Sequence, residues 1–104
     1  MTNIVSVYAT FGSDEEARRI GRAMVEERLA ACVNILGPCH SIYRWQGKVE
    51  EADEVAALFK VTAGGAELLI RRIGELHSYD VPAAVVWSIL DAPESYRRWV
   101  LENS

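Results

Sequence analysis

The sequence has few cysteines, an acidic charge balance and no long apolar run. Its 104 residues include 2 cysteines, and 11 lysines and arginines against 15 aspartates and glutamates give a formal net charge of −4. This balance argues against nucleic acid, because binding phosphates requires a clustered basic surface. No segment approaches the roughly 20 apolar residues that cross a bilayer, and residues 1–3 lack the basic start of a secretory signal. We therefore expect a cytoplasmic protein that binds neither nucleic acid nor membranes.

The spacing of the cysteines argues against a disulfide and against a local metal chelate. Cys32 and Cys39 lie seven positions apart on one predicted strand, which is about 23 Å when fully extended. A disulfide needs Cα atoms within about 7 Å, so we expect both thiols to be free. The chain also lacks the C-x-x-C and H-x-x-x-H spacings of compact metal sites.

Apolar periodicity predicts the order strand, helix, strand, strand, helix, strand, helix over one domain, residues 1–104. Ser13, with Glu16 three residues later, predicts a capping box at the first helix, whose buried stripe includes Gly21 and Val25. Two βαβ-like halves with an antiparallel hairpin between them indicate an α+β, ferredoxin-like split βαβ sandwich with a C-terminal helix. The predicted elements are residues 4–10, 13–25, 32–45, 48–61, 63–77, 84–90 and a helix that begins at 91–94.

The central hairpin is the most informative element, because its arms are long for so small a protein. They meet at Gln46-Gly47, and Gly37-Pro38 in the first arm predicts a bulge or an edge strand. The end of such a hairpin extends beyond the core, and it carries the aromatic residues Tyr43 and Trp45. Another subunit is the natural cover for such a surface.

No motif indicates catalysis. The chain lacks G-x-S-x-G, a glycine-rich phosphate loop and a nucleophile with an adjacent base. The loop at residues 10–13 lacks the arginine that acylphosphatase needs in this fold class, and it lacks the paired cysteines of a ferredoxin-like metallochaperone. We therefore expect a protein that is not an enzyme.

Three single residues each allow a structural and a functional interpretation. Cys32 suits either a small buried apolar position or a metal ligand. His77, just before Ser78-Tyr79-Asp80, suits either the C-terminal end of a helix or a functional site. Lys60 lies in an apolar strand on the face opposite Phe59, where a lysine either extends to solvent or meets an anionic partner.

Several short stretches, in order along the chain, resemble one family. They are residues 27–35 (ERLAACVNI), 41–49 (SIYRWQGKV), 54–55 (EV), 60–62 (KVT) and 77–82 (HSYDVP), with Tyr96 and Trp99 as a terminal Tyr-x-x-Trp element. Each is a weak signal alone, but together they are specific. On these residues the chain resembles the CutA divalent-cation tolerance proteins.

This resemblance implies a ferredoxin-like subunit in a tight homotrimer and a link to copper and other divalent cations, none of them obligatory. It also implies a cleft between subunits, by analogy with the trimeric PII signalling proteins. We expect Cys32 and His77 to be metal ligands in that cleft, since thiolate and imidazole suit copper(II). The predicted ligand-binding residues are Tyr43, Trp45, Lys60 and Tyr79.

Two alternatives to copper binding remain open. One is a PII-like signalling module that binds a small anion through Lys60 and the aromatic residues; the other is a stable scaffold for protein partners. The chain also departs from the family at Ser78, where a proline is common. The loss of that proline loosens the loop that presents His77 and Tyr79.

Overall fold

The computed structural model describes residues 2–104 and contains one four-stranded sheet with strand order β2-β3-β1-β4. Every neighbouring pair of strands is antiparallel. This is the ferredoxin-like arrangement, so the predicted α+β fold class is confirmed. The elements are β1 (Ile4–Phe11), α1 (Asp14–Glu26), β2 (Cys32–Trp45), β3 (Lys48–Thr62), a 3-10 turn (Ala63–Gly65), α2 (Ala66–Leu76), β4 (Ala84–Ser88) and α3 (Glu94–Asn103).

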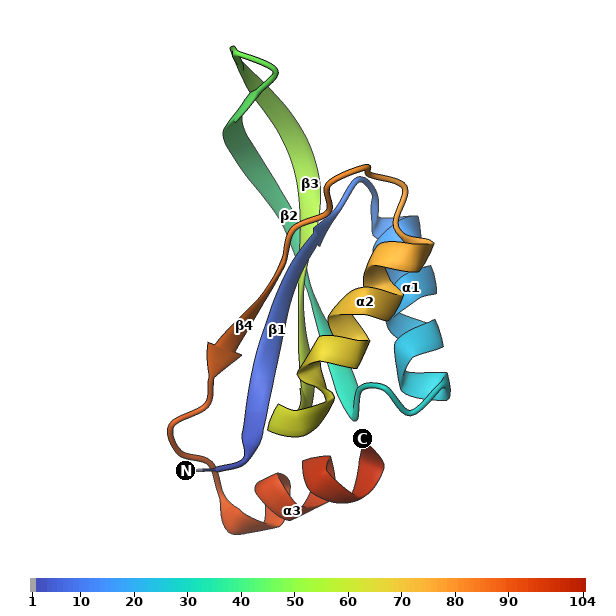
Figure 1. The fold of residues 1–104 in the computed structure, drawn as a ribbon, viewed down its shortest axis with the longest axis vertical. Coiled ribbons are helices and arrows are strands. Elements are labelled where there is room, and N and C mark those ends of the chain that lie inside the picture. The colour runs from blue at the N-terminus through green and yellow to red at the C-terminus, as the bar shows by residue number, and fades with distance from the viewer. Residues whose placement is uncertain (1) are drawn as a thin grey trace.

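Helices α1 and α2 lie side by side against one face of the sheet, and the main core lies between these two layers (Figure 1). Alternate residues of each strand point into this core, which is why the strands read as apolar with period two. Full burial of one such side chain stabilises the fold by about 1.5–3 kcal/mol. The fully buried members include Val7, Ala9, Phe11, Ile20, Met24, Phe59, Leu69 and Ile73.

The start of α1 follows the predicted capping pattern with one change. The Ser13 hydroxyl accepts a hydrogen bond from the Glu16 N–H at 3.1 Å, as expected for an N-cap. The Glu16 carboxylate reaches further back and accepts from the Gly12 N–H at 3.2 Å. Gly21 makes the predicted close approach, because a Cβ there would lie 3.1 Å from Val33 Cγ1. The prediction that Val25 is buried is wrong, since it is 37% exposed.

The hairpin is longer than the rest of the sheet, as the sequence predicts. Strand β1 pairs with β3 only from Val55 to Thr62, so the outer part of β3 pairs with β2 alone. Gln46 and Gly47 both have positive φ, 51° and 80°, as expected for a type I′ turn. A register shift between Ile35 and Gly37 confirms the predicted bulge. The chain measures 44 × 26 × 22 Å, and Figure 1 shows the hairpin projecting beyond the other elements.

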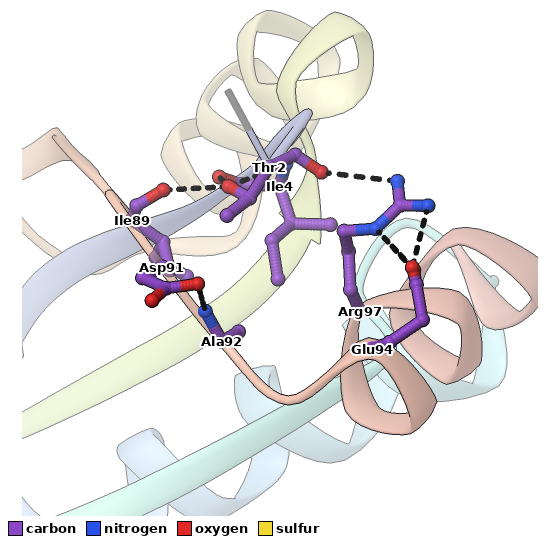
Figure 2. Close-up of polar contacts among 7 residues, drawn as sticks. All are labelled: Thr2, Ile4, Ile89, Asp91, Ala92, Glu94 and Arg97. Carbon is purple, nitrogen blue, oxygen red and sulfur yellow. Dashed lines mark hydrogen bonds and ion pairs between the residues drawn. The ribbon is translucent and has the colours of Figure 1, made fainter.

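The two ends of the chain are held together at the opposite end of the sheet, where α3 packs (Figure 1). There Ile4, Ala31 and Val100 form a second buried cluster. The Thr2 hydroxyl donates to the Ile89 carbonyl at 2.6 Å, and Arg97 donates to the Thr2 carbonyl at 3.4 Å (Figure 2). The fourth strand ends at Ser88, two residues before the predicted end. Beyond Ser88, the Ile89 carbonyl accepts its hydrogen bond from the Thr2 hydroxyl in place of a backbone N–H of β1.

The structure bears on three further expectations. Both cysteines are free in residues 2–104. No helix in this described range is both long and apolar enough to cross a membrane. The predicted second helix divides into a 3-10 turn followed by α2, which begins at Ala66.

Candidate functional site

A cavity of about 550 Å³ lies between the hairpin and the loop that follows α2. Tyr43 and Trp45 contribute to it from β2, and because residues i and i+2 of a strand share a face, Ser41 does as well. Tyr79 closes the cavity from the loop. The remaining lining residues are Thr10, Arg44, Glu54, Asp80, Val81 and Ala83.

Tyr79 is tied to the hairpin by a hydrogen bond to a buried carboxylate. Its hydroxyl donates to Glu54 Oε2 at 2.8 Å, and Glu54 is only 9% exposed. Burial, together with this hydrogen bond to the Glu54 carboxylate, raises the pKa of Tyr79 to about 12. Tyr79 is therefore a neutral donor at physiological pH, and it joins the loop to β3.

His77 links this loop to the end of β1. One ring nitrogen, Nε2, lies 2.8 Å from the Thr10 carbonyl, and the other, Nδ1, accepts from the Tyr79 N–H at 3.1 Å. A carbonyl only accepts and a backbone N–H only donates, so these two contacts assign the donor role to Nε2 and the acceptor role to Nδ1. The ring is also stacked on Phe11, with centroids 5.0 Å apart. Both nitrogens are thus occupied within the chain, and His77 acts as a support for Tyr79.

Glu16 holds the other side of the same loop. Its Oε2 accepts from the Ser78 N–H at 2.8 Å, while its Oε1 holds Gly12. Burial alone would raise the pKa of this carboxyl, but the hydrogen bonds from Ser78 and Gly12 outweigh it and lower the pKa of Glu16. The loop that carries Tyr79 is therefore fastened by a buried carboxylate, although position 78 holds serine and not the proline that the resemblance leads us to expect.

Cys32 lies far from this cavity within one chain. It pairs with Lys60, which pairs with Ser6 on β1, four residues from Thr10. Four strand residues span roughly 13 Å, so Cys32 and His77 do not share one ion in a single chain. The Cys32 thiol lies 3.5 Å from the Tyr96 hydroxyl, and burial, with the nearby thiol, raises the pKa of Tyr96 to about 12.

Residues 2–104 contain no cluster of three or more histidine, cysteine, aspartate or glutamate side chains that could hold a metal ion. The predicted pair of metal ligands therefore does not form a site within one described chain. It stays a prediction for an assembly, in which donors from different chains can meet.

Lys60 is on the face opposite Phe59, as predicted, but it does not reach the cavity. Its ammonium donates to Asn34 Oδ1 on the neighbouring strand. Of the predicted ligand-binding residues, the structure brings together Tyr43, Trp45 and Tyr79 and leaves Lys60 apart.

Glu54 and Asp80 were not among the predicted site residues, although both line the cavity. The position of Glu54 could have been found by counting back from the turn, because pairing of Trp45 with Lys48 places Cys39 opposite Glu54. That register puts Glu54 on the same face as Tyr43 and Trp45. Nothing in the local sequence signals that the loop would bring Asp80 to the same cavity.

A second polar cluster, which was not predicted, lies on the face of the hairpin opposite Tyr43 and Trp45. The two ring nitrogens of His40 lie 2.9 Å from Asp53 Oδ1 and 2.7 Å from Glu51 Oε1. Hydrogen bonds to Glu51 and then Asp53 raise the pKa of His40. Because neighbouring strand residues point to opposite faces, this cluster is separate from the cavity.

Comparison with known proteins gives a consistent result. The family model described as CutA1 divalent ion tolerance protein matches residues 5–103. The divalent-cation tolerance protein CutA of Thermus thermophilus is 46% identical over 98 residues, covering 94% of this chain and 95% of that protein. The protein of the same name from Pyrococcus horikoshii is 40% identical over 101 residues, covering 97% and 98%.

Solved structures agree with these sequence relatives. The structure of the divalent cation tolerance protein from Thermus thermophilus has a TM-score of 0.93 and 44% identity, covering 97% of this chain and 98% of that one. CutA1 from Pyrococcus horikoshii has a TM-score of 0.90 and 38% identity, covering 96% and 97%.

Proposed function

This chain belongs to the CutA family of divalent-cation tolerance proteins, and we propose that it works as a cytoplasmic homotrimer that binds copper(II) or another divalent cation reversibly in a cleft between subunits. The match of the family model to residues 5–103 is the observation that carries the link to divalent cations. The proposed role is binding and not catalysis.

The surface of one chain supports the proposed assembly. Tyr43, Trp45 and Trp87 are 43%, 41% and 49% exposed, although large aromatic side chains are usually covered. Trp87 stacks on Tyr8 with ring centroids 4.9 Å apart, on the sheet face opposite α1 and α2. Strand β2 is also an edge strand of 14 residues, and a long edge is a template for pairing with another chain.

The proposed assembly also determines which residues could bind the metal ion. No three donor side chains within residues 2–104 are placed to hold one metal ion, so a site with several ligands would draw them from more than one subunit. The Cys32 thiol is free, and a thiolate suits copper. His77 would first have to release the Thr10 carbonyl or the Tyr79 N–H, which makes it the more demanding of the predicted ligands.

Isothermal titration of the assembled protein with copper, in oxygen-free buffer, tests this proposal. We expect Cys32→Ala and His77→Ala each to weaken binding, while Cys39→Ala serves as the matched thiol control. Unchanged affinity in both variants would refute these ligand assignments. Light scattering at micromolar concentration tests the trimer separately, since a monomer would contradict it.

The small-anion module has less support from the geometry. Its key cation, Lys60, is bonded to Asn34 and is not part of the cavity lining. Stabilisation by an organic anion in a thermal-shift screen, abolished by Lys60→Ala, would favour this alternative over copper binding. Capture of a protein partner, with no metal or metabolite bound, would favour the scaffold.

A further inference from the structure

We propose that the cavity between the hairpin and the loop after α2 binds an organic cation, an ammonium group attached to a small apolar or aromatic body. The volume of about 550 Å³ is within the usual range for small-molecule sites. Three aromatic rings, those of Tyr43, Trp45 and Tyr79, contribute to the lining.

The charge of the cavity favours a cation. Its lining includes the carboxylates of Glu54 and Asp80 and one basic side chain, Arg44. Arg44 is turned toward the end of the hairpin, where its Nη1 lies 3.5 Å from the Gly47 carbonyl. Neither carboxylate forms an ion pair with any lysine, arginine or histidine of residues 2–104.

Glu54 provides a buried carboxylate in the wall of the cavity. Its side chain belongs to a residue that is 9% exposed, and the Tyr79 hydroxyl donates to Oε2 only. No hydrogen bond within the described chain reaches the other oxygen, Oε1, which keeps some contact with solvent. A buried carboxylate without a cationic partner is costly unless a cation or further donors approach it. An ammonium group at Oε1 would supply a positive charge and N–H donors.

The aromatic lining distinguishes an organic cation from a metal ion. The faces of tyrosine and tryptophan rings attract cations and also pack against apolar groups. A divalent metal ion would instead need several oxygen, nitrogen or sulfur donors at one point, and residues 2–104 provide no such cluster. A monovalent ammonium with an apolar body matches one buried carboxylate beside aromatic walls.

This inference rests on the proposed function in one respect: Tyr43 and Trp45 also belong to the surface that we propose another subunit approaches, so the cavity has to stay open within the cleft between subunits. Its lining residues come from one chain, so their charge and aromatic character do not depend on copper binding. The two proposals can therefore fail separately.

The experiment is isothermal titration of the full-length assembled protein at pH 7 with three probes of similar size: benzylamine, benzyl alcohol and benzoate. Benzylamine is protonated at this pH, benzyl alcohol is neutral and benzoate is an anion. We expect benzylamine to bind about tenfold or more tightly than benzyl alcohol, and benzoate to bind least. Benzoate binding as tightly as benzylamine would overturn the proposal.

Charge-neutral variants locate the binding. We expect Glu54→Gln to weaken benzylamine binding about tenfold while leaving benzyl alcohol unaffected. The matched control is Glu50→Gln, an exposed carboxylate on the same strand. Asp80→Asn provides a second test that does not disturb the bond between Tyr79 and Glu54, and it should also weaken benzylamine binding. Unchanged benzylamine affinity in both Glu54→Gln and Asp80→Asn would overturn the assignment.

Two readouts separate this inference from the proposed function. A trimer that binds copper but not benzylamine would refute the organic-cation site alone. A protein that binds benzylamine, with the expected effect of Glu54→Gln, but is monomeric or binds no copper would refute only the corresponding part of the proposed function.

Discussion

Replacement of Glu16 by alanine should cost far more stability than its place in a polar helix turn suggests. Its carboxylate is 5% exposed and accepts from the N–H groups of Gly12 at 3.2 Å and Ser78 at 2.8 Å. Truncation leaves both N–H groups without their partner. A buried, unsatisfied polar group costs about 1–3 kcal/mol. Both sites are only partly buried, so water can replace some of the loss, and we expect about 2–4 kcal/mol in total.

Thermal and urea unfolding at one fixed protein concentration measure this loss, because assembly would make the midpoint depend on concentration. For a domain of this size the expected loss lowers the Tm by about 10 °C or more. The neighbouring Glu15→Ala is the matched control, since the Glu15 side chain is exposed and pairs only with Arg19 at 3.4 Å. An exposed pair of this kind contributes less than about 1 kcal/mol.

The pH dependence of the same residue gives an independent check. The hydrogen bonds lower the pKa of Glu16 in the folded state, so the folded protein binds fewer protons there than the unfolded chain. The stabilisation is fully present above the ordinary glutamate pKa and is lost as the pH falls through the folded pKa. Glu16→Ala should therefore lose part of the acid sensitivity of the parent. A stability for Glu16→Ala equal to that of Glu15→Ala would refute the reasoning.

Other predictions concern the hairpin and the core. Trp45→Glu should weaken assembly, measured by light scattering, more than Trp99→Glu does, although the two side chains are similarly exposed at 41% and 44%; equal effects would contradict an interface at the hairpin end. The raised pKa of His40 means that its charged contacts are present below its ordinary pKa and are lost as the pH rises through the folded value. An imidazole titration by NMR should therefore have a midpoint above 6.5, and a midpoint at or below this value would exclude the contacts in solution. Phe59→Ala, at a fully buried site, should destabilise the fold by about 3–5 kcal/mol in urea unfolding, and a loss below about 1 kcal/mol would argue against this core.

The order of elements and the hairpin were predictable because local signals agree with the tertiary structure. The Gln46-Gly47 turn sets the pairing register, and alternation then places Tyr43 and Trp45 on one face. Gly21 was predictable for a similar reason, since a glycine in a buried stripe indicates a close neighbour. In these cases, one local pattern is enough to decide the structure.

Other features depend on contacts between segments that are distant in sequence. The occupied state of both His77 nitrogens requires Thr10 to lie beside the end of α2, and the bond from Lys60 to Asn34 requires a particular side-chain direction. Val25 lies at the margin of the apolar stripe of α1, where only the surrounding packing decides exposure. Periodicity cannot supply these contacts, because it describes one element at a time.

The bulge in β2 gives the hairpin two independently registered halves. Ile35 pairs with Ala57 and Gly37 with Ala56, so Leu36 is the single residue outside the ladder, and it is 57% exposed. The core sets the inner register and the turn sets the outer one, and the surplus residue is absorbed between them. Deletion of Leu36 would therefore remove the bulge and leave the side chains of Tyr43 and Trp45 on the same face of the hairpin. Insertion or deletion of one residue elsewhere in β2 would turn every side chain beyond it to the other face, so Leu36 is the position at which this strand can change length by one residue and keep Tyr43 and Trp45 in the cavity wall.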